Sequence, residues 1–327
     1  MEKQTRWGIL GTGAIAKHFA TGLSFLPDAE LVAVGSRSRT SAAQFADLFD
    51  VPHRHSSYDD LANDPEVDVV YIAVPHALHK ASSLLCLQAG KPVLCEKPFT
   101  INAGEAEELI AFARQQELFL MEAMWTRFLP SIMKLQEVLS SGVIGDVRML
   151  TADFGFRTNF SPESRLFNPA LGGGALLDVG VYPVSLASML FGEPEKVQGL
   201  AHLGETGVDE QSAMIFGYRE GQLAILSTAI RTTTLQEATI LGTQGSIKIH
   251  APWWRSTKLS LSIPGQQEEV IEAPFDGNGY NYEAAEVMRC LESGQLESDR
   301  MPLDETLSIM KAMDQVRAQW GLKYPME

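Results

Sequence analysis

The sequence predicts a two-domain α/β protein, in which a doubly wound parallel sheet precedes an α+β domain with a large, mostly antiparallel open sheet. Length is the first observation, because 327 residues are enough for about two domains. The second is an alternation of strand-like and helix-like segments over residues 1–123. The third is a change to long strands of alternating pattern after that point. We therefore expect one domain over residues 1–123 and another over residues 124–327.

Short apolar runs and amphipathic segments follow one another in the first domain. The strand-like runs lie at residues 6–10, 31–36, 67–74, 92–96 and 118–122. The helix-like segments lie at residues 14–26, 41–49, 79–90 and 103–116. The run at 67–74 is almost entirely apolar, which is typical of a parallel strand buried on both faces.

The second domain combines hairpins with a few helices. Expected strands lie at residues 147–156, 212–218, 222–230, 258–263 and 268–273, with two more around the glycines of 237–250. Helices are expected at residues 130–140, 175–192, 282–294 and 303–320. The last of these helices could pack back on the first domain.

Composition excludes several classes of protein. The formal charge of −15 argues against a broad nucleic-acid or anionic-membrane surface. Three scattered cysteines are too few for a disulfide framework or a four-ligand zinc site. His53 and His55 lie in an expected loop without an acidic or cysteine partner at metal spacing, so no metal is expected. Without a signal sequence or a run of 18 apolar residues, a cytoplasmic location is expected.

A glycine-rich loop follows the first strand. Residues 8–16 read Gly-Ile-Leu-Gly-Thr-Gly-Ala-Ile-Ala, which fits the pattern G-x-G-x-x-A at the start of a helix. Glycine allows the tight turn and the close approach of backbone to a pyrophosphate, and the helix N-terminus attracts the anion. The alternative is an ordinary turn between a strand and a helix. The pattern favours dinucleotide binding through Gly11, Gly13, Ala14 and Ile15.

The end of the second strand indicates which dinucleotide is bound. NAD-binding proteins usually carry Asp or Glu there, whereas this sequence reads Ser36-Arg37-Ser38-Arg39 after Gly35. A guanidinium group pairs well with a phosphate. Ser36, Arg37 and Arg39 therefore favour NADP(H) over NAD(H), the alternative being a solvated basic loop.

Four motifs together resemble the glucose-fructose oxidoreductase / inositol dehydrogenase (Gfo/Idh/MocA) family over essentially the whole chain. They are the glycine-rich loop, residues 74–79 (VPHALH), residues 96–98 (EKP) and residues 172–182 (GGGALLDVGVY). Residues 121–128 (MEAMWTRF) resemble the branch of dimeric dihydrodiol dehydrogenases and NADP-dependent D-xylose dehydrogenases. The resemblance implies a Rossmann domain followed by a substrate-binding and dimerisation domain.

Three residues carry the expected chemistry. Lys97 follows a buried strand at the edge where such sheets bind ligands. Asp178 and Tyr182 are four residues apart on an expected helix, so they would share one face. A tyrosine acts as an acid–base group only when nearby positive charge lowers its pKa, and Lys97 is the natural source. Many family members carry histidine at the position of Tyr182.

The resemblance adds further cofactor and substrate contacts. Those expected at the cofactor are Val74, Pro75, His76, His79, Glu96, Lys97, Pro98, Trp125 and Arg127. A cap of the following helix is the alternative for His79. Those expected to line the substrate pocket are Trp125, Phe154, Trp254 and Phe275.

The sequence thus predicts an NADP-dependent oxidoreductase that moves a hydride between nicotinamide C4 and a carbinol carbon of a sugar, cyclic polyol or trans-dihydrodiol. Two alternatives are a non-catalytic NADP-sensing regulator and an NAD-dependent glycosidase. Apolar residues on both faces of the expected second sheet, as in residues 213–216 and 223–226, predict a homodimer through that sheet.

Overall fold

The computed structural model describes residues 4–327, which form two compact units. Unit 1 combines the chain up to Thr100 with Gly104–Trp125 and Asp276–Thr306. Unit 2 combines Ile101–Ala103, Thr126–Phe275 and Leu307–Glu327. The sequence-based division had placed residues 276–306 in the second domain. The structure instead groups Asp276–Thr306, which includes the first residues of the last helix, with unit 1.

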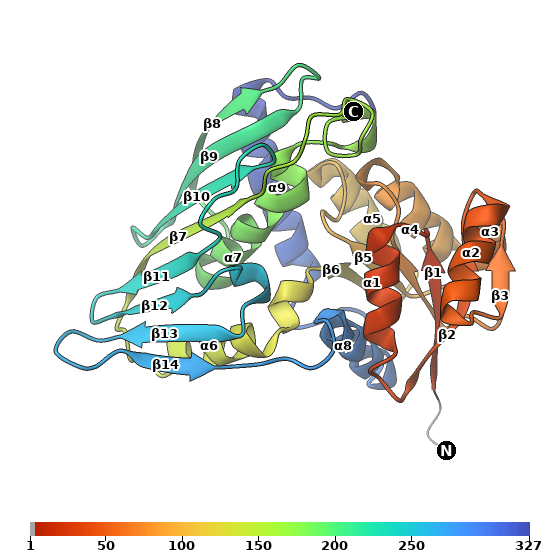
Figure 1. The fold of residues 1–327 in the computed structure, drawn as a ribbon, viewed down its shortest axis with the longest axis horizontal. Coiled ribbons are helices and arrows are strands. Elements are labelled where there is room, and N and C mark those ends of the chain that lie inside the picture. The colour runs from red at the N-terminus through yellow and green to blue at the C-terminus, as the bar shows by residue number, and fades with distance from the viewer. Residues whose placement is uncertain (1–3) are drawn as a thin grey trace. The chain divides into compact units, whose positions relative to one another are not determined.

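Unit 1 contains a six-stranded parallel sheet of order β3-β2-β1-β4-β5-β6 (Figure 1). Its strands are β1 (Thr5–Leu10), β2 (Ala29–Gly35), β3 (His53–His55), β4 (Val69–Ile72), β5 (Val93–Glu96) and β6 (Leu120–Ala123). Its helices are α1 (Ala14–Leu23), α2 (Arg39–Phe49), α3 (Tyr58–Ala62), η1 (His76–Leu78), α4 (His79–Gln88), α5 (Ala103–Gln115) and α8 (Tyr280–Glu292). The order reverses direction at β1, which places the loop after β1 where such sheets bind ligands.

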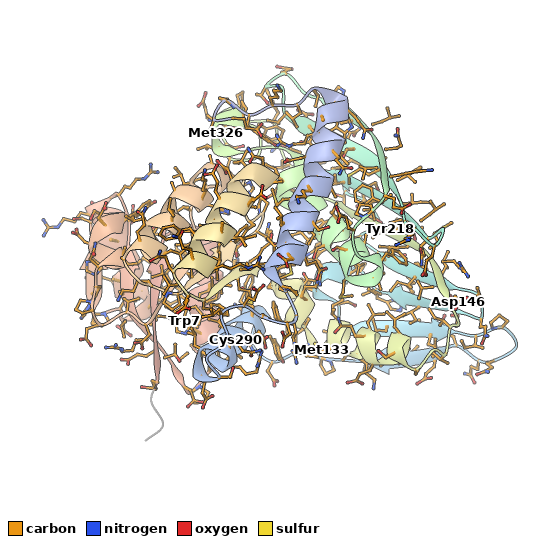
Figure 2. All side chains as sticks on the ribbon, turned by 180° about the vertical axis from the view of Figure 1, so that it is seen from behind. Trp7, Met133, Asp146, Tyr218, Cys290 and Met326 are labelled. Carbon is orange, nitrogen blue, oxygen red and sulfur yellow. The ribbon has the colours of Figure 1, made fainter. Side chains whose placement is uncertain are left out.

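The core of unit 1 forms around aromatic side chains on the central strands. Trp7 on β1 and Tyr71 on β4 are fully buried, and Phe19 of α1 stacks on Tyr71 with ring centroids 3.7 Å apart. Helix α8 packs against α1, and Cys290 on α8 is buried in this unit (Figure 2). Cys86 and Cys95 are buried as well, and burial raises the pKa of both thiols.

Unit 2 is built on an eight-stranded sheet of order β14-β13-β12-β11-β7-β10-β9-β8 (Figure 1). Its strands are β7 (Val147–Gly155), β8 (Lys196–Leu203), β9 (Asp209–Gly217), β10 (Leu223–Ala229), β11 (Ala238–Gly242), β12 (Ser246–Ile249), β13 (Lys258–Ser262) and β14 (Glu269–Glu272). All neighbours are antiparallel except β7 and β10, which are parallel. The prediction of a mostly antiparallel sheet is confirmed.

Helical segments complete unit 2. They are η2 (Trp125–Phe128, with Trp125 in unit 1), α6 (Pro130–Ser140), η3 (Pro169–Leu171), η4 (Leu176–Gly180), α7 (Val181–Phe191), η5 (Trp253–Arg255) and α9 (Leu303–Trp320), which begins in unit 1. Among residues 4–327, one helical stretch, Pro169–Phe191, is long and apolar enough to cross a membrane by length and composition alone. Most of it is buried within the fold, as expected for a core helix.

The structure corrects two local expectations. His53 and His55 were expected in a loop, but they form the edge strand β3, which pairs with β2. The expected α-helix over residues 175–192 begins with a π-helical turn, η4, so the α-helical spacing argument for Asp178 and Tyr182 does not apply unchanged. Such turns inside helices occur frequently at functional sites.

Candidate active site

The glycine-rich loop of unit 1 has the backbone that a pyrophosphate requires. Gly11 has φ of +113°, and a side chain there would collide with the carbonyl oxygen of Ala73. Around Gly13, by contrast, a Cβ atom would meet no atom of the described chain within 4 Å. Gly13 precedes α1, whose first turn has neither a side-chain cap nor an acidic residue in the described structure. This open, positively polarised helix end fits a dinucleotide phosphate.

The loop after β2 presents basic side chains to solvent. Ser36 is buried, and its hydroxyl oxygen accepts a hydrogen bond from the amide of Ser38 at 3.2 Å. Arg37 and Arg39 are exposed, and the Arg37 guanidinium lies 5.9 Å from the ring centre of Tyr58. Residues 35–39 contain no carboxylate. The arrangement offers an exposed guanidinium beside an aromatic ring for a phosphate group.

His79 connects the ends of two strands of unit 1. Its Nδ1 lies 2.7 Å from the carbonyl oxygen of Pro98, and its Nε2 lies 3.0 Å from that of Val74. Burial lowers the pKa of His79 to about 4, against the opposing effect of these two carbonyls, so the ring is neutral at pH 7. A neutral imidazole can donate to only one of these two carbonyl oxygens. The contacts place His79 between Val74, after β4, and Pro98, which follows Lys97, and neither contact is to an amide of α4. His76 lies beside it, with ring centroids 5.6 Å apart.

Glu96 organises the end of β5. The Tyr71 hydroxyl donates to Glu96 Oε1 through a short hydrogen bond, and the Lys97 amide donates to Oε2 at 3.1 Å. Lys97 is half-buried, and its bond to Pro98 is cis. Burial and the charge of Glu96 raise the pKa of Tyr71 well above its usual value. Tyr71 therefore stays protonated and holds the carboxylate that fixes the Lys97 backbone.

Another carboxyl group of unit 1, Glu283 of α8, is buried as well. It is 0% exposed, and neither of its carboxyl oxygens has a hydrogen-bond partner among the described residues. Burial, assisted by the charge of Glu96, raises its pKa well above the usual value. Burial thus favours the protonated form of Glu283, a residue that sequence analysis missed. The available signal was its spacing with Val287 and Cys290, which places it on the apolar stripe of α8.

The glycine triplet of unit 2 serves internal packing. A Cβ atom on Gly173 would lie 2.8 Å from the carbonyl oxygen of Leu166, and one on Gly174 would collide with the carboxylate of Asp209. The absent side chains of these glycines make room for Asp209 and for the loop around Leu166.

Asp209 holds the π-helical turn η4 through a hydrogen bond to its backbone. It is fully buried at the start of β9, and its Oδ2 accepts a hydrogen bond from the Leu176 amide at 2.7 Å. Its Oδ1 has no hydrogen-bond partner among the described residues. Burial raises the pKa of Asp209 to about 7, although the Leu176 amide acts in the opposite direction. A second carboxyl group that sequence analysis missed thus holds the turn that carries Asp178.

Asp178 and Tyr182 both lie in the core of unit 2. Asp178 is 4% exposed, and its Oδ1 lies 2.6 Å from a guanidinium nitrogen of the partly exposed Arg165. Tyr182 is 6% exposed, and its ring centre lies 5.2 Å from that of Phe154. Asp178 is therefore an ion-paired carboxylate, while Tyr182 borders an aromatic group. The sequence predicted these residues but not Arg165.

The expected aromatic pocket residues divide between the two units. Phe154 and Trp254 stack with ring centroids 3.3 Å apart, and together with Tyr182 they form one aromatic cluster in unit 2. Trp125 belongs to unit 1, where it stacks on Tyr280 with centroids 4.6 Å apart. Phe275 is half-buried at the last position of the main unit 2 segment. Within unit 2, Phe154 contacts the rings of both Tyr182 and Trp254.

Arg127, expected at the cofactor, is buried in unit 2. Its Nε donates to the hydroxyl oxygen of Ser185 at 3.0 Å, and a terminal nitrogen donates to the Ser185 carbonyl at 2.7 Å. Ser185 lies on α7, three residues after Tyr182. The structure thus assigns Arg127 the positioning of the helix that carries Tyr182.

The geometry defines a class of protein: a dinucleotide-binding α/β unit joined to a unit with a large antiparallel sheet and a buried tyrosine. Sequence models agree with this description. The oxidoreductase family with an NAD-binding Rossmann fold matches residues 5–124, and the GFO/IDH/MocA C-terminal domain matches residues 132–248. The chain belongs to the GFO/IDH/MocA family of NAD(P)-binding oxidoreductases, as the motifs predicted.

Curated proteins and solved structures similar to this chain include several oxidoreductases. Trans-1,2-dihydrobenzene-1,2-diol dehydrogenases from Mus musculus and Homo sapiens are 40% and 39% identical, and each alignment covers 98% of both chains. A 3-ketoreductase from Actinomadura kijaniata, solved with NADP and TDP-benzene, is 25% identical with a TM-score of 0.86 over 97% of this chain and 98% of that one. An aldose-aldose oxidoreductase from Caulobacter crescentus, 22% identical, shares the fold with a TM-score of 0.88 over 98% of both chains.

Proposed function

We propose that this oxidoreductase uses NADP(H) to interconvert a carbinol and a carbonyl group, with a trans-dihydrodiol, cyclic polyol or aldose as substrate. The observation that carries the proposal is full-length similarity to dihydrodiol dehydrogenases together with Lys97 and Tyr182 at their motif positions. A bound nicotinamide supplies the hydride acceptor at its C4 atom. The remaining chemistry, binding and proton transfer, belongs to the side chains of this chain.

The choice of NADP(H) is supported by the loop after β2. An exposed Arg37 and the absence of a carboxylate over residues 35–39 favour a 2′-phosphate and disfavour bare ribose hydroxyls. A charge-assisted phosphate contact contributes about 1.5–3 kcal/mol, which corresponds to roughly 10- to 150-fold in affinity.

The proton transfer is assigned to Tyr182. In the oxidation direction the Tyr182 oxygen accepts the proton of the substrate hydroxyl, while a hydride leaves the carbon that bears this hydroxyl for nicotinamide C4. Lys97, at the lysine position of the family motif, is assigned to binding the substrate. Asp178, held by Arg165, orients the substrate. In reduction the same groups act in reverse order.

A substrate panel tests the proposal. Purified enzyme is incubated with NADP+ and, separately, with trans-dihydrodiols, cyclic polyols and aldoses, and cofactor reduction is followed by absorbance. We expect turnover with at least one class, faster with NADP+ than with NAD+ at equal concentration. Arg37→Ala should lose roughly 10- to 150-fold in NADP+ affinity and little in NAD+ affinity. Equal affinity of the wild type for both cofactors would contradict the assigned preference.

The outer face of the unit 2 sheet supports a homodimer as part of the proposal. Met214, Phe216 and Leu226 are buried on the inner face, while Ile215 and Ile225 oppose each other on the outer face and are 50% and 43% exposed. On β8, in the same sheet, Leu200 is 82% exposed. Contiguous apolar surface of this kind marks an interaction site.

Light scattering tests the dimer. We expect twice the chain mass of 35.8 kDa for the wild type and a shift toward monomer for Ile215→Lys combined with Ile225→Lys. Leu48→Lys, on an exposed position of α2, is the matched control and should leave the mass unchanged. A wild type that is monomeric at micromolar concentration would rule out this part of the proposal.

A further inference from the structure

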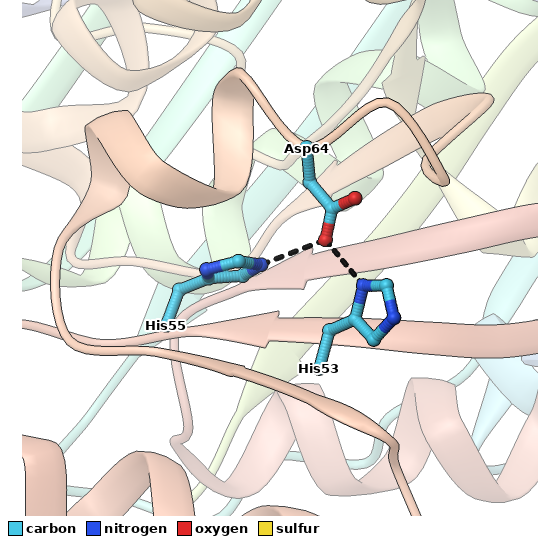
Figure 3. A group of neighbouring side chains, drawn as sticks. All are labelled: His53, His55 and Asp64. Atoms are coloured by element: carbon cyan, nitrogen blue, oxygen red, sulfur yellow. Dashed lines mark hydrogen bonds and ion pairs between the residues drawn. The ribbon is translucent and has the colours of Figure 1, made fainter.

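Two histidines and one aspartate converge at the edge of the unit 1 sheet (Figure 3). His53 and His55 are two residues apart on β3, so their side chains lie on the same face of the strand. His53 Nδ1 lies 2.6 Å from Asp64 Oδ2, and His55 Nε2 lies 2.8 Å from the same oxygen. The three candidate ligand atoms lie within 4.8 Å of one another. Sequence spacing missed Asp64 because the chain reaches it only after passing through α3.

Asp64 is held so that one oxygen faces the histidines. Its Oδ1 accepts a hydrogen bond from the Glu66 amide at 2.9 Å, and its backbone carbonyl accepts one from Lys91 Nζ at 2.7 Å. The carboxylate side chain is only 4% exposed. These contacts leave Asp64 Oδ2 facing the ring nitrogens of both histidines.

Two imidazole nitrogens and one carboxylate oxygen are ligands that zinc and related divalent transition metals accept. The His53 and His55 side chains are 38% and 22% exposed, which leaves an entry path and room for water as a further ligand. We propose that His53, His55 and Asp64 form a binding site for one divalent transition-metal ion of the Zn²⁺ type. Nothing in the proposed hydride chemistry requires this ion, so the two proposals stand separately.

The observed distances are close to those a metal site needs. Tetrahedral zinc bonds of about 2.0–2.2 Å separate neighbouring ligand atoms by roughly 3.3 Å. The present separations of 2.6 and 2.8 Å are those of hydrogen bonds, so the histidine rings have to retreat by about half an ångström or slightly more. Partly exposed rings on an edge strand can make this movement. Each imidazole then carries its proton on the ring nitrogen that faces away from the metal.

The position of the site indicates a structural effect. Strand β3 has only three residues and pairs with β2 alone within the sheet. Asp64 belongs to the segment that follows α3 and leads to β4. One ion would therefore link the edge strand to the next connection and stabilise the edge of the sheet. Binding to the folded state alone raises the stability in proportion to the logarithm of the metal concentration over Kd.

Titration of the untagged, full-length chain with Zn²⁺ against a chromogenic chelator tests the proposal. We expect one ion per chain and, with Co²⁺ as a probe, the visible absorption of a site with nitrogen and oxygen ligands. His53→Gln, His55→Gln and Asp64→Asn each remove one ligand and should weaken binding by about 100-fold or more. Asp64→Asn keeps Oδ1 for the Glu66 amide, which preserves the local fold. His202→Gln, at an exposed position of β8, is the control and should bind like the wild type.

Thermal unfolding provides the second readout. Zn²⁺ should raise the Tm of the wild type and of His202→Gln, and leave the Tm of His53→Gln and His55→Gln unchanged. Metal-free Tm values of all variants show whether each variant is folded. Equal zinc affinity of wild type and His53→Gln, or a wild type that does not compete with the chelator at micromolar zinc, would overturn the proposal.

Discussion

Asp209→Asn tests whether a buried, protonated carboxyl group supports the turn that carries Asp178. Asp209 is fully buried, and its Oδ2 accepts the Leu176 amide at 2.7 Å. Asparagine has nearly the same shape, and its amide oxygen can accept the same hydrogen bond. The substitution therefore removes the titration of this group while it preserves the contact.

The expected magnitude follows from the pKa of Asp209. Burial raises this pKa from 3.8 to about 7 in the folded protein. When the pKa of an acid is higher in the folded than in the unfolded protein, its contribution to stability is fully present below the unfolded-state pKa. That contribution is lost as the pH rises toward the folded-state pKa. At about 1.36 kcal/mol per pH unit, the loss between pH 3.8 and pH 7 is about 4 kcal/mol. Between pH 5 and pH 8 the wild type should lose about 3 kcal/mol relative to Asp209→Asn.

Urea unfolding at pH 5 and pH 8 measures this difference. The free energy of unfolding of Asp209→Asn should exceed that of the wild type increasingly as the pH rises. Asp146→Asn alters an exposed carboxylate and should stay within about 0.5 kcal/mol of the wild type at both pH values. A difference between wild type and Asp209→Asn that is the same at pH 5 and pH 8 would refute the reasoning, because Asp209 would then already be ionised at pH 5.

Two further predictions concern the other buried acids. Glu283→Gln should become more stable than the wild type as the pH rises, because burial raises the pKa of Glu283 and keeping its proton costs about 1.36 kcal/mol per pH unit. Glu286→Gln, on the same helix, should be less stable than the wild type at pH 7, because hydrogen bonds from Arg289 outweigh burial and lower the pKa of Glu286. Urea unfolding at pH 5 and pH 8 compares the two variants. Asp178→Asn should lower kcat by about 10-fold or less, and Arg165→Gln should have a similar effect. If kcat falls by more than about 100-fold in Asp178→Asn alone, Asp178 is the proton acceptor.

Local sequence was sufficient to predict a dinucleotide-binding fold from the loop after β1, while the cofactor preference read from the tip of β2 stays a prediction. Gly11 requires glycine because of a neighbouring strand, yet its spacing with Gly13 already shows in nine consecutive residues. Arg37 is informative because the residue type expected for NAD is missing at one defined position. Lys97 and Tyr182 were found by their motifs, each of which is contiguous in the chain.

Contacts between distant segments could not be predicted in the same way. Asp209 meets Leu176 across 33 residues, and Asp64 meets His53 across 11 residues, so neither pair has a local pattern. Strand β3 escaped detection because three residues, His-Arg-His, show no apolar alternation. The return of α8 to unit 1 depends on its packing against α1.

The kinetics of Tyr182→Phe test the central claim most directly, since this substitution removes one hydroxyl group from an otherwise unchanged aromatic cluster with Phe154. Steady-state rates with NADP+ are measured on the substrate that the panel identifies, and NADP+ affinity is measured separately by fluorescence titration. The account predicts that kcat falls about 10²- to 10⁴-fold with cofactor affinity nearly unchanged. Turnover of Tyr182→Phe within a few fold of the wild type would contradict the assignment of Tyr182 as the group that transfers the proton.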